Sequence, residues 1–174
     1  SLKQLGEAES RGQSQASLYS SAFMYFILII VGLVMALNSF REAGLILSVA
    51  FLSIGLSFLG LFIGQQNYGF IGTISAIGLI GLSINDSIIV LSHIKEEAEK
   101  KPLTKAELIE VVIRSTRHII TTSLTTLGGF LPLIFASVFF KPLAWAMSIG
   151  VLGATITALL YIPAMFMIMR KVKY

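Results

Sequence analysis

Five long apolar runs, separated by short polar breaks, dominate the pattern of this 174-residue chain. They cover approximately residues 18–37, 43–63, 70–93, 119–139 and 143–168, and each approaches the roughly 20 apolar residues with which an α-helix crosses a bilayer. The runs are continuously apolar and do not alternate, which favours helices over the strands of a membrane barrel. The pattern therefore predicts an all-α fold, a polytopic bundle of five transmembrane helices.

Three polar segments flank or interrupt these runs. Residues 1–17 form a lead-in without the pattern of a signal peptide, and the missing initiator Met suggests a piece of a longer protein. Between the third and fourth runs, Thr104 and Glu107 have the spacing of a capping box, and apolar residues recur after them. We expect a short amphipathic helix near residues 103–114, on the cytoplasmic surface or against the bundle. Residues 169–174 form a basic tail.

Composition supports a membrane protein and excludes several other classes. Hydrophobic residues make up 55% of the chain, mean hydropathy is +0.85, and charged residues are 13%, against about a quarter in soluble domains. With no cysteine there is no thiol catalysis, disulfide or cysteine-based metal site. No nucleophile–base pair or zinc-site spacing is apparent, so we predict no catalytic residue, no metal and no enzyme activity. The basic residues flank the spans, which gives no indication of nucleic-acid binding.

The placement of Lys and Arg predicts the orientation of the five spans. One side of the membrane receives three of the thirteen basic residues, Lys3, Arg11 and Lys141. The other side receives the remaining ten: Arg41, Lys95, Lys100, Lys101, Lys105, Arg114, Arg117, Arg170, Lys171 and Lys173. Because cytoplasmic loops are rich in Lys and Arg, we expect the C-terminus in the cytoplasm and the N-terminus outside it.

Asp86 is the one charged residue in the apolar run from 70 to 91. An acid at the bilayer centre costs about 2.5–3.5 kcal/mol on insertion scales, so it marks a functional site unless hydroxyl groups simply satisfy it. On a helix, Ser83 lies three residues before it, and Asn85 is its neighbour. We therefore predict a proton relay with Asp86 at its centre and Ser83 and Asn85 beside it. The alternative is a structural acid with no proton cycle.

Hydroxyl side chains gather at the start of the fourth run, at residues 121–123, 125 and 126. Thr122 is the candidate for the relay, although such hydroxyls commonly bond to their own helix backbone. Arg117, at the edge of this run, is a candidate ion partner for a carboxylate. It can equally extend to the lipid headgroups.

Several of these segments together resemble the resistance-nodulation-division (RND) transporters. Residues 36–41 (ALNSFR) are similar to the loop after their eighth helix, and residues 6–10 (GEAES) to the segment before that helix. Residues 78–90 (GLIGLSINDSIIV) resemble the tenth helix, 117–132 (RHIITTSLTTLGGFLP) the eleventh, and 160–164 (LYIPA) the end of the twelfth. The resemblance covers nearly the whole chain, in order.

This resemblance implies the C-terminal half of an RND membrane domain, helices 8–12, in the bacterial inner membrane. Its partners would be the rest of the same transporter, in a homotrimer with a periplasmic adaptor and an outer-membrane channel, within the lipid bilayer. Protons would be the coupling ion for export of drugs or other amphiphiles, with no other cofactor. In that family a tenth-helix lysine pairs with carboxylates of the fourth helix, but here Asn85 stands in its place and Asp86 follows. An arginine common at position 115 of this chain is Ser115, and a proline common at 118 is His118.

Two other interpretations stay open at this point. The SecF component of protein export has a similar Ser-Ile-Asn-Asp stretch followed by a similar Ile-Thr-Thr-Ser-Leu-Thr-Thr stretch, so the chain resembles it as well. The segments at 6–10, 38–41 and 131–132 favour the efflux transporters. Alternatively, the chain is a structural membrane half with no relay role of its own.

Overall fold

The computed structural model describes residues 2–100 and 104–170, and these are helical apart from short connections. The helices are α1 (Leu2–Leu37), α2 (Phe40–Ile63), α3 (Phe70–Lys100), α4 (Lys105–Ala136) and α5 (Lys141–Arg170), with no strand in the described part of the chain. All five are long and apolar enough to cross a membrane. The predicted all-α bundle class with five spans is confirmed. Most of the predicted basic tail, residues 171–174, lies outside the described residues.

Packing divides the chain into two compact units, residues 1–44 and 45–174. The first unit comprises α1 and the beginning of α2, which meet at a tight turn. Asn38 in this turn has a φ of 49°, in the left-handed region that asparagine tolerates better than most residues. The polar lead-in predicted for residues 1–17 belongs to the long helix α1.

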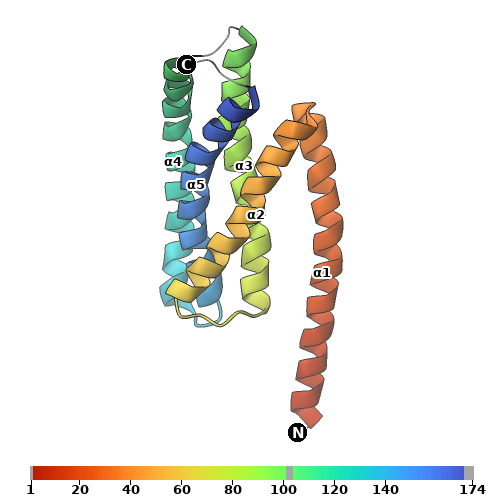
Figure 1. Ribbon diagram of the computed structural model, residues 1–174. Helices are drawn as coiled ribbons and strands as arrows, with labels where there is room; N and C mark the ends of the chain where they lie inside the picture. The colour runs from red at the N-terminus through yellow and green to blue at the C-terminus, as the bar shows by residue number, and fades with distance from the viewer. Residues whose placement is uncertain (1, 101–103, 171–174) are drawn as a thin grey trace. The chain divides into compact units, whose positions relative to one another are not determined.

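The second unit is built around α5, which packs against both α3 and α4 (Figure 1). Its core contains four buried apolar residues, Leu79 of α3 and Met147, Val151 and Ala154 of α5. Leu56 of α2 and Phe130 of α4 pack against this core. The core therefore fixes the height at which polar side chains of α3, α4 and α5 face one another.

Glycines bring α2 close to α5. A Cβ added to Gly60 would lie 2.7 Å from the carbonyl oxygen of Trp145 and 2.9 Å from the Cα of Ala146. Nearer the beginning of α2, the Ser48 hydroxyl donates to the Tyr161 hydroxyl of α5 over 3.2 Å. Small residues that let helix backbones approach are typical of membrane helix packing.

Helix α4 differs from the sequence prediction in its length. The expected amphipathic helix near residues 103–114 and the span expected from residue 119 form one helix, Lys105–Ala136. Its start is as predicted, because Glu107 Oε2 accepts from the Thr104 backbone N–H over 2.9 Å and the Thr104 side chain accepts in return. The helix continues through Ser115 and Thr116, whose hydroxyls donate to the carbonyls of Val111 and Val112 on the same helix.

Candidate functional site

Asp86 lies inside the second unit, where three helices meet. Its side chain on α3 is buried, with 5% exposed, and Oδ2 accepts a hydrogen bond from Oγ1 of Thr155 on α5 over 3.4 Å. The same Thr155 oxygen lies 2.6 Å from Oγ of Ser123 on α4. Thr155 and Ser123 are also buried, so α3, α4 and α5 share one enclosed polar cluster.

No ion pair holds this carboxylate among the residues that the structure describes. Residues 143–169 of α5 carry no charged side chain, and on α4 the side chain whose charge acts on Asp86 is that of His118. A buried charge without a cationic partner is costly, while the neutral acid with hydroxyl partners is not. This environment suits a carboxyl group that gains and loses a proton.

A small crevice reaches the carboxylate. It has a volume of about 10 Å³ and is lined by Leu82, Asp86, Thr122, Ser123, Thr126, Val151 and Ala154. A space of about 10–15 Å³ holds one water molecule. The crevice therefore offers a place for one water between Asp86 and Thr122, although no hydrogen bond joins these two side chains directly.

The structure brings some of the predicted relay residues together and separates others. Thr122 lines the crevice with Asp86, but its hydroxyl donates to the His118 carbonyl over 3.0 Å. Ser83 is buried and donates to the Ile80 carbonyl over 2.9 Å. Asn85 is exposed, because adjacent helical residues point about 100° apart. Their relay roles stay predictions.

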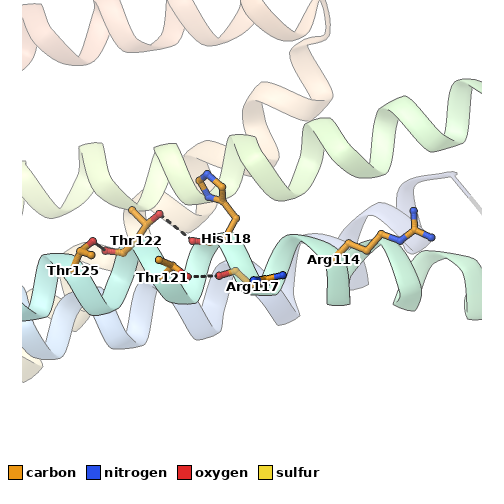
Figure 2. Close-up of a pocket in the computed structure, with 6 residues that line it drawn as sticks. All are labelled: Arg114, Arg117, His118, Thr121, Thr122 and Thr125. Carbon is orange, nitrogen blue, oxygen red and sulfur yellow. Dashed lines mark hydrogen bonds between the residues drawn. The ribbon is translucent and has the colours of Figure 1, made fainter.

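Arg117 is exposed on α4, outside the enclosed polar cluster that contains Asp86. Figure 2 shows the open pocket of about 380 Å³ that it lines with Arg114, His118, Thr121, Thr122 and Thr125. The threonine hydroxyls donate to carbonyls of their own helix, as the dashed lines indicate. Arg117 makes no ion pair with Asp86 in the described part of the chain, so a partner for it on another segment stays a prediction.

A second polar link joins α3 to α4 through His93 and Ser115. Nδ1 of His93 lies 2.8 Å from Oγ of Ser115, which is fully buried and also donates to the Val111 carbonyl. Ser115 is the position at which the sequence departs from the arginine of the resembled family. Here it connects α3 to α4.

Thr155 is the residue that the sequence analysis missed. It lies in the apolar run 143–168, two residues before Thr157, and nothing in the spacing separates the two. In the structure Thr157 donates to the carbonyl of Gly153 on its own helix, while Thr155 faces Asp86 and Ser123. Ser123 was visible only as one member of a hydroxyl cluster. Its position four residues, about one turn, after the core residue Val151 would have been the signal, once the packing face of α5 was known.

Comparison with known proteins identifies relatives of this chain. A family model described as the AcrB/AcrD/AcrF family matches residues 2–170. The chain is 34% identical over 98 residues, 53% of its length, to the multidrug export protein AcrF of Escherichia coli K12, and covers 9% of that protein. It is 24% identical over 90% of its length to the swarming motility protein SwrC of Bacillus subtilis 168, covering 15% of it. It is 25% identical over 84% of its length to the nickel and cobalt resistance protein CnrA of Cupriavidus metallidurans, covering 14% of it. The chain thus spans about a tenth to a seventh of these relatives.

Proposed function

The chain belongs to the AcrB/AcrD/AcrF family of resistance-nodulation-division transporters, and we propose from this premise that it is the proton-coupling half of an exporter's membrane domain. Membership makes it part of a membrane transporter and not an enzyme. It also decides between the two resemblances in the sequence, in favour of efflux transporters over the SecF-like component. The proposal concerns the finer step, the use of a proton gradient.

The buried carboxyl group of Asp86 carries this proposal. As an anion it lacks a cationic partner, and as a neutral acid it fits its apolar and hydroxyl surroundings, so binding a proton changes the energy of this site strongly. The crevice with Thr122 supplies the approach for a proton by way of one water. Ser83 and Asn85 flank the acid on α3, and Asn85 is exposed where a further helix would pack.

The orientation and surroundings form part of the same proposal. Ten of the thirteen Lys and Arg residues fall on the side of the α3–α4 connection and the C-terminus, which supports a cytoplasmic location for that side of the inner membrane. The remaining helices and the periplasmic domains of the transporter would cover the exposed faces, in a homotrimer with an adaptor and an outer-membrane channel. Arg117 would pair there with a carboxylate of that other part.

The substrate class proposed is drugs or other amphiphiles. The names of the relatives speak of multidrug export, swarming motility and resistance to nickel and cobalt, so family membership alone assigns no cargo. The proposal for proton coupling does not depend on the cargo.

The test replaces Asp86 by asparagine in the native polypeptide that carries this chain. Asparagine has the same shape and can still accept the hydrogen bond of Thr155, so the fold is retained while the proton site is lost. We expect export and export-linked proton uptake in proteoliposomes to be abolished. Glu99→Gln is the matched control, because it removes an exposed carboxylate from the C-terminal end of the same helix.

The purely structural interpretation makes the opposite prediction. If Asp86 only satisfies packing, Asp86→Asn transports at the rate of the control and with the same dependence on the proton gradient. That result would end the proposal that Asp86 carries the coupling proton.

A further inference from the structure

A chain of hydrogen-bonding groups runs from Asp86 across two further helices. Its members are Asp86 Oδ2, Thr155 Oγ1, Ser123 Oγ and the carbonyl oxygen of Ile119, with successive separations of 3.4, 2.6 and 2.9 Å. It begins on α3, passes through α5 and ends on the backbone of α4. A buried hydroxyl has one hydrogen to donate, so the protonation of Asp86 constrains the direction of every bond in the chain.

With Asp86 ionised, the carboxylate is an acceptor only. Thr155 then donates to Oδ2, and Ser123 donates its single hydrogen to Thr155. The carbonyl of Ile119 consequently loses the Ser123 hydroxyl and keeps only its helical backbone partner. This arrangement satisfies both buried hydroxyls.

With a proton on Oδ2, the direction reverses. The acid donates to Thr155, Thr155 donates to Ser123, and Ser123 donates to the Ile119 carbonyl. The change requires rotation of two hydroxyl hydrogens and no bond is formed or broken except the O–H bond of the acid. A serine that bonds to the carbonyl four residues earlier bends its helix, so only the protonated arrangement adds this bend to α4.

We propose that Thr155 and Ser123 transmit the protonation state of Asp86 to the bend of α4 at Ile119–Ser123. The inference rests on the proposed function, in which Asp86 binds the coupling proton. It adds Thr155 and Ser123 as positioning residues and identifies α4 as the helix whose bend responds to the proton. Gly128, Gly129 and Pro132 lie further along the same helix, where the backbone is least able to resist such a change.

In the described part of the protein, few other titratable groups lie near the hydrogen-bonded series from Asp86 to Ile119. His118 lies on α4 just before Ile119, and its charge acts on Asp86. His93 lies two turns along α3, bound to Ser115. The stretch 143–169 of α5 and the part of α2 in this unit, residues 45–63, carry no charged side chain. The two histidines are therefore the groups whose titration has to be separated from that of Asp86.

The experiment uses the native polypeptide with spin labels at two exposed positions, Ile113 on α4 and Leu160 on α5. This segment contains no cysteine, so within it the labels attach only at the two introduced cysteines, and any cysteine elsewhere in the polypeptide is first replaced by serine. The label-to-label distance is measured at acidic and alkaline pH, together with export. Thr155→Val removes the linking hydroxyl at constant shape, and Thr157→Val is the matched control because its hydroxyl bonds only its own helix.

We expect wild type, Thr157→Val and the conservative Thr155→Ser to show a pH-dependent distance. Thr155→Val should lose it and lose about tenfold in export rate, the lower limit for a hydrogen bond to a charged group. Ser123→Ala should have the same effects as Thr155→Val, and it replaces Thr155→Val as the test variant if the latter fails to fold. Replacing both His93 and His118 by glutamine should leave the pH-dependent distance in place.

The outcomes separate the two proposals. A pH-dependent distance that persists in Thr155→Val and Ser123→Ala overturns the transmission through these residues, even if Asp86→Asn abolishes export. A distance that loses its pH dependence only in the histidine variant overturns it as well. Normal export by Asp86→Asn refutes the proposed function itself.

Discussion

Replacement of Gly60 by alanine should weaken the packing of α2 on α5. The new Cβ would lie 2.7 Å from the Trp145 carbonyl oxygen and 2.9 Å from the Ala146 Cα, where ordinary van der Waals contact begins at 3.4 Å. Both opposing atoms belong to the backbone of α5, so no side-chain rotation relieves the overlap. Overpacking of this kind typically costs about 1–3 kcal/mol.

Gly55 provides the matched control on the same helix. A Cβ there meets nothing within 4 Å, and alanine is favoured over glycine in a helix by up to about 1 kcal/mol. The gain in helix propensity is common to both variants, so they should differ in unfolding free energy by the overpacking cost alone, about 1–3 kcal/mol. The measurement is denaturant-induced unfolding of the purified native polypeptide in micelles, followed by circular dichroism.

Equal stability of the two variants would refute the close backbone approach. The reasoning also predicts a functional consequence, because α5 carries Thr155. If Gly60→Ala forces the start of α5 away from α2, export should fall with the stability, while Gly55→Ala should export normally.

Three further predictions concern other contacts. Thr104→Ala removes the capping box of α4 and should cost about 1 kcal/mol, seen as faster amide exchange in its first turn. Lys100→Gln breaks exposed pairs with Glu96 and Glu97, of 3.0 and 3.3 Å, and should leave the denaturation midpoint unchanged, because water and salt screen such pairs. A double-mutant cycle of Ser123→Ala with Thr155→Val should give a coupling energy of about 1 kcal/mol. A coupling energy of zero would contradict the 2.6 Å bond between the two hydroxyls.

The helices and their class were readable from the sequence because bilayer-length apolar runs leave few alternatives. The start of α4 was also readable, since the capping box is a local signal between Thr104 and Glu107. The continuity of α4 was not, because the charged and hydroxyl residues around Ser115 look like a boundary. Their side chains bond back to the helix, and that becomes visible only in three dimensions.

The site was predictable in part for a similar reason. Asp86 stands out by the cost of its charge alone, without knowledge of its neighbours. Its partner is set by which face of α5 meets α3, and a glycine and a leucine determine this: a Cβ on Gly150 would overlap the methyl groups of Leu79. No local pattern distinguishes Thr155 from Thr157 before that contact is known.

The neighbouring positions Asn85 and Asp86 connect these observations to the family. A helix turns about 100° per residue, so adjacent side chains address different neighbours. Asn85, in the place of the family's lysine, is exposed, while Asp86 is 5% exposed and bonds to Thr155 of the same half. A shift of the ionisable group by a single residue thus moves it from the outer face of α3 into the α3–α4–α5 cluster. If Asp86 binds the coupling proton, as proposed, the first side chains to respond are Thr155 and Ser123, which are hydrogen-bonded to it, and not the residues on the face that Asn85 presents.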